Sequence, residues 1–167
     1  MACAAGLAVH GHAVQSVFNS FPLRSIEDYL IKYAGRRGVA LSLVQRGAAD
    51  AMRATSRSNG VFYVSVDLPV RDDGATLYPM GPVDVPLEWG PAILARRLNM
   101  PIVPVTCEQV AGGLSSVMLS APVDPMTVTA DELCRRWVAD LHERLMTRPE
   151  QWWAWGFTQL RPREPKV

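Results

Sequence analysis

The alternation of short β-rich runs with helical stretches constrains the fold of this chain more than any other feature. Runs of β-branched and aromatic residues at 13–19, 39–44 and 61–66 have strand character, and helical stretches at 25–35 and 48–57 separate them. Strands that alternate with helices form parallel sheets with helices on both faces. We therefore predict an α/β fold, with a mostly parallel central sheet flanked by helices.

The second half of the chain continues this pattern after a long interruption. Residues 68–87 are rich in Pro and Gly and too long for an ordinary connection, which is typical of a functional loop. Helices are predicted at 88–98 and 130–146, and strands at 102–107 and 117–120. The first predicted helix opens on Ser25-Ile26-Glu27-Asp28, which has the form of a capping box, and Gly35 can end it.

Length and charge exclude several classes of protein. A chain of 167 residues that is 49% hydrophobic supports one core, so we predict a single domain over residues 1–157 and a flexible basic tail over 158–167. Seventeen Lys and Arg against sixteen Asp and Glu leave a net charge of +1. We predict no nucleic-acid partner, because no strong overall field draws the chain to one.

The cysteines indicate a reducing compartment, and the apolar start lacks the features of a secretory signal or a spanning helix. Cys3, Cys107 and Cys134 are odd in number and form no C-x-x-C pair, so neither a disulfide framework nor a zinc site is indicated. The apolar opening is far shorter than the roughly 20 residues of a spanning helix. No Lys or Arg precedes Arg24, so the charged region of a secretory signal is missing.

Polar residues follow the third predicted strand, where ligands of α/β sheets gather. Asp67 ends that strand, Arg71 and Asp72-Asp73 follow it, and Glu88 lies at the start of the next helix. Paired carboxylates suit acid–base work, but for Asp72-Asp73-Gly74 a simple turn is the favoured interpretation. For Asp67 both a functional and a structural role stay open.

The histidines do not supply a convincing catalytic base. His10 and His12 flank Gly11 without a Cys or carboxylate at ligand spacing, so we predict no metal site. His142 lies in a charged helical stretch and is expected at the surface. Phosphate-binding, dinucleotide-binding and serine-hydrolase motifs are absent, and no cofactor is predicted.

The C-terminal region gathers aromatic side chains among cations. Amphipathic rings beside cations suit a membrane interface, whereas a terminal segment that docks its rings on the core is the alternative. The membrane-interface candidates are Trp152, Trp153, Trp155 and Arg161.

Four segments together resemble one protein family. They are NGVFYVSVD at 59–67, LYPMG at 77–81, GPAILARRLNMPIVPV at 90–105 and RPEQWWAW at 148–155. In order and spacing over residues 10–157 they are similar to the bacterial lipid A biosynthesis (lauroyl/myristoyl) acyltransferases, of the lysophospholipid acyltransferase-like superfamily. The resemblance implies an acyltransferase-like α/β core on the cytoplasmic face of the bacterial inner membrane, or in the cytoplasm if the chain is truncated.

The resemblance also implies a reaction and its participants. A fatty acyl chain would pass from acyl carrier protein or acyl-CoA to a hydroxyl of a glycolipid, in lipopolysaccharide synthesis. Asp67 matches a supporting acidic residue near the family's active site. The substrate-binding candidates are Arg36 or Arg37 in the family's second motif, Arg71 in the loop, and Trp89 and Gly90 on the acyl-chain side.

The chain departs from the family at its catalytic motif. The family's base is a His followed five positions later by Asp or Glu, whereas His10 is followed by Gln15 and His12 by Val17. We expect the motif and the membrane anchor to lie upstream of Met1, which makes this form an N-terminally truncated and inactive one. Two alternatives stay open: a non-catalytic lipid- or partner-binding remnant, and an acyltransferase that uses His10 or His12.

Overall fold

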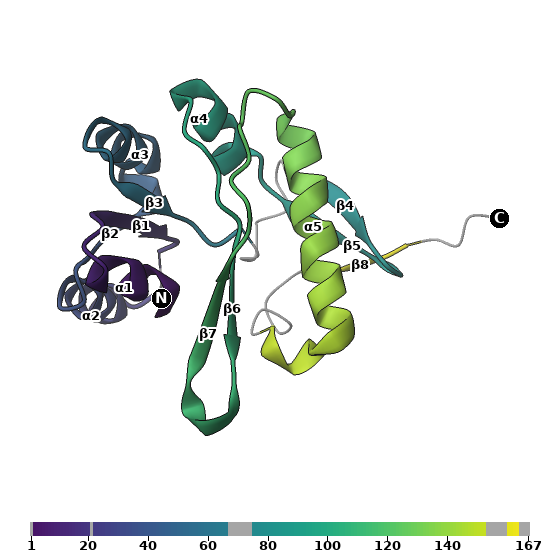
Figure 1. Ribbon diagram of the computed structural model, residues 1–167, viewed down its shortest axis with the longest axis horizontal. Helices are drawn as coiled ribbons and strands as arrows, with labels where there is room; N and C mark the ends of the chain where they lie inside the picture. Colours follow the sequence, from purple (N-terminus) through teal and green to yellow (C-terminus); the bar gives the residue numbers. More distant parts are fainter. Residues whose placement is uncertain (1, 21, 67–74, 153–159, 164–167) are drawn as a thin grey trace. The chain divides into compact units, whose positions relative to one another are not determined.

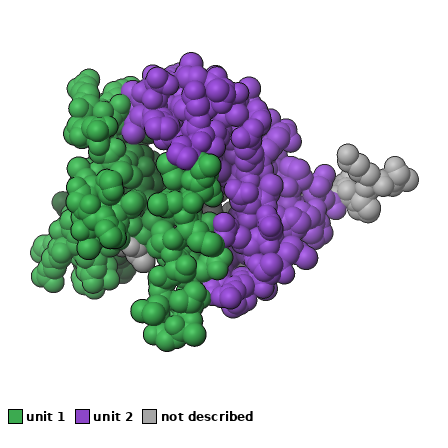
Figure 2. All heavy atoms as spheres, viewed as in Figure 1, with its two compact units in different colours: residues 1–64, 103–121 green, residues 65–102, 122–167 purple. Residues whose placement is uncertain are grey.

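The computed structural model describes residues 2–20, 22–66, 75–152 and 160–163 and shows a mixed α/β protein with small, partly parallel sheets (Figure 1). By contact density it divides into two compact units, coloured separately in Figure 2. Unit 1 comprises Met1–Val64 and Val103–Ala121, and unit 2 comprises Ser65–Ile102 and Pro122–Val167. Each unit has a hydrophobic core of its own.

Unit 1 contains a three-stranded parallel sheet in the order β2-β1-β3. Val14 is level with Val39 on one side and with Val61 on the other, so the three strands begin side by side. A separate antiparallel hairpin, β6–β7, completes the unit. The elements are α1 (Ala2–Val9), β1 (Val14–Phe18), α2 (Arg24–Gly35), β2 (Val39–Leu43), α3 (Ala48–Arg57), β3 (Val61–Tyr63), β6 (Val105–Gln109) and β7 (Ser115–Leu119).

Small aliphatic side chains fill the core of unit 1. Ala4 of α1 and Ala34 of α2 are fully buried, which lets both helices come close to the strands. The buried members of this cluster are Ala4, Val14, Ala34, Val39 and Leu41. Because helices join the parallel strands, neighbours in this core such as Val14 and Val61 are distant in the sequence.

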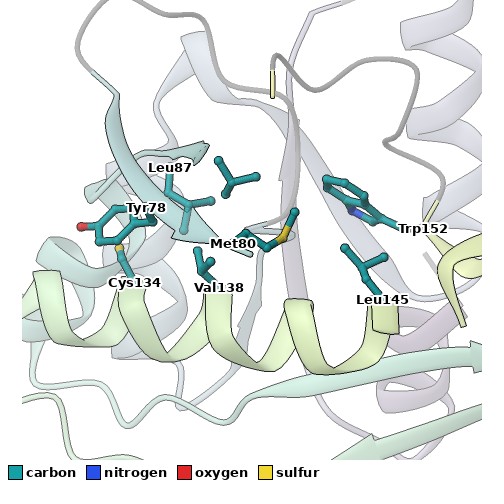
Figure 3. Close-up of a cluster of buried hydrophobic side chains, with 8 residues drawn as sticks. Tyr78, Met80, Leu87, Cys134, Val138, Leu145 and Trp152 are labelled. Carbon is teal, nitrogen blue, oxygen red and sulfur yellow. The ribbon is translucent and has the colours of Figure 1, made fainter. Parts of the chain in front are cut away.

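Unit 2 joins an antiparallel sheet, β4-β5-β8, to a long helix. Figure 3 shows Tyr78 and Met80 lying over α5, with Trp152 beside Leu145. Burial of these aromatic and long side chains removes far more apolar surface from water than the small residues of unit 1 do. The elements are β4 (Thr76–Met80), β5 (Val83–Leu87), α4 (Gly90–Leu98), α5 (Ala130–Thr147) and β8 (Arg161–Pro162).

Helix α5 has the sequence signals of a stable amphipathic helix. The Thr129 hydroxyl accepts a hydrogen bond from the Glu132 backbone N–H at 3.1 Å, so it caps the first turn. Leu133, Val138 and Leu145 are buried at helical spacing. The observed helix confirms the predicted one to within a residue at its C-terminal end.

The structure corrects the prediction of one mostly parallel sheet. Only β1, β2 and β3 are parallel among the described strands, and the other two sheets are antiparallel. Residues 76–87, predicted as loop, form the β4–β5 hairpin around Gly81, whose φ of +60° suits glycine. The alternation of apolar residues on both sides of Gly81 is the signal of this hairpin, which the abundance of Pro and Gly obscured.

Smaller corrections concern element ends. Helix α2 begins at Arg24 with Leu23 as its N-cap, so the predicted capping box at Ser25 does not form. Strand β3 ends at Tyr63, not Val66, and β6 begins at Val105, after Pro104. Prolines have no N–H for a strand ladder, which accounts for the late start of β6.

The described part of the predicted flexible tail is paired. Arg161 is opposite Asp84 in the β5–β8 register, and the Arg163 N–H donates to the Pro82 carbonyl oxygen at 3.0 Å. No helix within the described ranges is long and apolar enough to cross a membrane. Compactness does not test cooperative folding, so the single domain over residues 1–157 stays a prediction.

Candidate functional site

The carboxyl edge of the parallel sheet in unit 1 is the first candidate site. Here β1 leads into α2 and β2 leads, through a short turn at Val44–Arg46, into α3. The N-caps are Leu23 and Gly47, whose side chains offer no acceptor for the first helical N–H groups. Two helix N-termini at one edge of a sheet present N–H donors and partial positive charge, which suits an anionic group.

The principal predicted residue of this edge lies beyond the described residues. Asp67 follows the last residue of β3 by four positions, and both Asp67 and Arg71 are outside the ranges that the structure describes. The predicted role of each therefore stays a prediction.

The structure places the two predicted arginines at the opposite edge of the same sheet. Arg36 and Arg37 follow α2 and precede β2, so they lie at what we call the amino edge, formed by the turns at residues 10–13, 36–38 and 58–60. Both are exposed. A five-residue strand rises about 16 Å, so these arginines do not share a small site with the carboxyl edge.

Histidines His10 and His12 also lie at the amino edge and are exposed. A general base must come within about 3 Å of the proton that it removes, or act through one water. About 16 Å of strand separates them from the carboxyl edge. This separation counts against the alternative in which one of them serves as the base for a substrate bound there.

His142 is less exposed than predicted. It is half-buried on α5, and a Cβ added at Gly81 would come within 3.0 Å of its Nε2 atom. Glycine at position 81 therefore serves both the left-handed turn and the close approach of the imidazole. Within the described part of the chain, no group of three or more His, Cys, Asp and Glu could hold a metal ion.

Trp89 belongs to a hydrogen-bonded cluster in unit 2, and Gly90, the next residue, begins α4. The Trp89 Nε1–H donates to the Tyr78 hydroxyl at 2.5 Å, and that hydroxyl donates to Asp131 Oδ1 at 3.0 Å. Arg135 Nε donates to Asp131 Oδ2 at 2.8 Å. The cluster thus connects β4, the start of α4 and the first turns of α5, three elements that are distant in the sequence.

The chemistry of this cluster is that of a structural support. Burial, followed by the hydrogen bond to Asp131, raises the pKa of Tyr78 above its usual range, so its hydroxyl stays protonated. The hydrogen bond from Arg135 lowers the pKa of Asp131. A neutral phenol between an indole and a paired carboxylate holds Trp89, and with it the start of α4, in a fixed position.

Tyr78 and Asp131 were not singled out from the sequence. Tyr78 lies within the segment at 77–81 that carries the family resemblance, but its partner is 53 positions away in the chain. The only sequence signals at these two positions are the apolar alternation of β4 and the N-cap of α5, which indicate regular secondary structure. Nothing in the local sequence signals that they meet.

The aromatic residues of the C-terminal region were expected either at a membrane interface or docked on the core. Trp152 is 5% exposed and packs in the cluster with Met80 and Leu145, so its ring does not reach a lipid surface. This favours docking on the core for Trp152 and corrects its assignment to a membrane interface. Arg161 is exposed in β8, and Trp153 and Trp155 lie outside the described residues.

Comparison with protein-family models and with curated protein sequences finds no match for this chain.

Proposed function

We propose that this chain is an acyltransferase-family domain for the transfer of a fatty acyl chain from acyl carrier protein or acyl-CoA to a hydroxyl of a lipid A-like glycolipid. The observation that carries the proposal is the order of the four segments at 59–67, 77–81, 90–105 and 148–155. In this proposal the mostly parallel acyltransferase core is only partly represented, by β1, β2 and β3. The protein acts at the cytoplasmic face of the bacterial inner membrane.

The carboxyl edge of unit 1 supports this proposal. Acyl transfer develops negative charge on the carbonyl oxygen, and helix N-termini at this edge supply donors for such charge. Asp67 follows β3 and orients a base or acceptor hydroxyl in the proposed reaction, while Arg71 contacts the substrate. By the family resemblance Trp89 and Gly90 match the acyl-chain side, and within unit 2 Tyr78 positions Trp89.

The chain lacks the family's His-x4-Asp/Glu motif, so the proposal assigns no activity to this sequence by itself. The same absence favours a second candidate: a non-catalytic domain of this family that binds a lipid or a protein partner.

Two measurements on the native protein distinguish the acyltransferase proposal from the non-catalytic binding candidate. The first is its intact mass in its source cells, compared with the 18.4 kDa of this chain. The second is transfer of labelled acyl groups from acyl carrier protein or acyl-CoA to a glycolipid, for the native protein and its Asp67→Asn variant. Asp84→Asn, a carboxylate on β5, is the matched control.

A larger mass with a His-x4-Asp/Glu motif, and transfer that Asp67→Asn lowers and Asp84→Asn does not, is the expected result. A native mass of 18.4 kDa with no transfer favours the binding candidate. Transfer by this chain alone that the double variant His10→Ala and His12→Ala abolishes would overturn the proposal that this form is inactive.

A further inference from the structure

We propose that the amino edge of the parallel sheet in unit 1 is a surface that docks on an anionic lipid bilayer. The inference goes beyond the proposed function, because this edge is separated by about 16 Å of strand from the carboxyl edge. The structural argument is independent of catalysis and comes from the charges, the turns and the apolar side chains at this edge.

The topology places cationic side chains in a row. Because Val14, Val39 and Val61 are level, the turns before them lie next to one another in the order of the strands. Arg36 and Arg37 precede β2, His12 precedes β1, and Arg57 ends the helix before β3. The three arginines are exposed, and the turns at 10–13, 36–38 and 58–60 contain no Asp or Glu. A local positive surface thus occurs in a chain whose net charge is only +1.

Backbone geometry holds these turns in place. Each turn contains one left-handed residue: Gly11, Gly38 or Asn59, with φ of 87°, 74° and 53°. A Cβ at Gly38 would lie 3.2 Å from the Ala8 Cβ, so the turn before β2 packs against the end of α1. The Val61 N–H donates to the Ala13 carbonyl oxygen at 2.8 Å. The turns that carry the arginines are therefore ordered before binding, so binding costs little backbone conformational entropy.

Helix polarity explains part of this arrangement but not all of it. Helices α1, α2 and α3 end at the amino edge, and cations are favoured near helix C-termini. That effect gives no reason for large apolar side chains at the same place. Val9 is 81% exposed beside His10, and Tyr29 on α2 is 63% exposed.

An aromatic and cationic pair connects the edge to the exposed side of α2. The Arg37 guanidinium carbon lies 3.6 Å from the centre of the Tyr33 ring, and the Tyr33 and Tyr29 rings are 5.9 Å apart. Arg37 Nη1 also donates to the Tyr33 carbonyl oxygen at 3.4 Å. Stacking uses the face of the guanidinium and leaves its other N–H groups for further acceptors. Tyrosines and an apolar tip beside arginines are the composition of a headgroup-level surface.

The test is co-sedimentation of the full chain with vesicles at about 0.15 M salt. One vesicle preparation is phosphatidylcholine alone, and in the other about a third of the lipid is phosphatidylglycerol. The triple variant Arg36→Gln, Arg37→Gln, Arg57→Gln removes the edge charge. The control, Arg97→Gln, Arg136→Gln, Arg148→Gln, removes the same charge from exposed positions of unit 2.

We expect binding to the anionic vesicles only, and about a hundredfold weaker partitioning for the edge variant, at about fivefold for each arginine. The control variant should change by less than about threefold, because its arginines are not in the turns of the amino edge. Equal losses for both variants, or no loss for the edge variant, would overturn the proposal.

A second pair of variants tests the apolar contribution. Val9→Asp should weaken binding to the anionic vesicles. The control is Leu114→Asp, which changes another exposed side chain of unit 1, 67% exposed, and should leave binding unchanged. Both sites are exposed, so folding is expected to survive, and circular dichroism checks it. Binding of the edge to single-stranded RNA without binding to vesicles would contradict the proposal. The vesicles contain no glycolipid and no acyl donor, so a negative result leaves the acyl-transfer proposal untouched.

Discussion

Units 1 and 2 bury their apolar residues in different ways. Unit 1 combines a parallel sheet with the β6–β7 hairpin, and the buried members of its core cluster are small aliphatic side chains. Unit 2 is antiparallel, and its core contains Tyr78, Met80 and Trp152 against α5. Unit 2 also has a polar cluster that joins residues 53 positions apart.

This difference in side-chain size bears on stability. Both units contain contacts between residues that are distant in the sequence, such as Val14 with Val61 in unit 1 and Tyr78 with Asp131 in unit 2. The large buried side chains of unit 2 remove more apolar area from water than the small ones of unit 1 do. Unit 2 should therefore be more sensitive to the loss of single side chains and slower to open locally.

The reaction rates of the cysteine thiols compare local opening in the two units within one molecule. This comparison has the largest expected effect. Cys107 is exposed, whereas Cys3 in unit 1 and Cys134 in unit 2 are 2% and 0% exposed. Burial raises the pKa of both buried thiols, so each reacts only after local opening. We expect Cys107 to react at least about a thousandfold faster than Cys134 with an aromatic disulfide reagent, with Cys3 between them.

Mass spectrometry of the labelled peptides at successive times gives the three rates. A Cys134 that reacts faster than Cys3 would reverse the order of local stability and contradict the comparison. Equal rates for all three would mean that neither core is closed.

Truncation of one core side chain in each unit has the next largest effect. Trp152→Ala should destabilise the protein by about 3–5 kcal/mol, because it leaves a large cavity beside Met80 and Leu145. Val39→Ala in unit 1 removes two methyl groups and should cost about 2 kcal/mol. Urea unfolding followed by tryptophan fluorescence and by circular dichroism measures both.

The same pair of variants tests whether residues 1–157 unfold as one domain. A single transition that both substitutions shift indicates cooperative unfolding. Two transitions, with Trp152→Ala moving one and Val39→Ala the other, would show that the units unfold separately and that the single-domain prediction is wrong.

The contrast between the units also explains what could be predicted from sequence. Residues 48–57 were predicted to the residue, and β1 and β2 nearly so, because amphipathic periodicity and turn residues such as Asn59-Gly60 are local signals. The β4–β5 hairpin and the pairing of Arg161 with Asp84 were missed. Strand pairing depends on a partner elsewhere in the chain, and proline-rich composition gave the opposite indication.

The candidate site shows the same limit. That Asp67 follows a strand is evident from the sequence, since the run at 61–66 is continuous. The predicted order of helix and parallel strand also places Arg36 and Arg37 before a strand, at the opposite edge, and the loose motif match obscured this. The cluster of Trp89, Tyr78 and Asp131 needs a tertiary contact between a hairpin and a distant helix.

Removal of the Tyr78 hydroxyl tests the polar cluster of unit 2. Tyr78→Phe should cost about 1–2 kcal/mol, because Trp89 Nε1 and Asp131 lose one hydrogen bond each and both remain accessible to water. The pKa of Tyr78 is raised in the folded state, mainly by burial, so folding favours the protonated phenol. Its contribution is fully present below the unfolded pKa of about 10 and is lost as the pH rises above it.

Unfolding midpoints at several pH values above about 9 measure this effect. The wild-type protein should lose stability more steeply than Tyr78→Phe in this range. Parallel curves for the two proteins would show that Tyr78 ionises as easily in the folded state as in the unfolded one.

The smallest expected effect is that of Asp131 in acid. The hydrogen bond from Arg135 lowers the pKa of Asp131 in the folded state, so the ionised carboxylate stabilises the fold. That contribution is present above the unfolded pKa of about 3.9 and disappears as the pH falls through the lower folded value. The free energy of unfolding of Asp131→Asn should therefore fall less steeply than that of the wild type below about pH 4. Urea unfolding at successive pH values measures this difference. Asp50→Asn, which breaks an exposed ion pair with Arg53 in unit 1, is the control. If both variants flatten the acid limb equally, the effect belongs to net charge and not to the cluster around Tyr78.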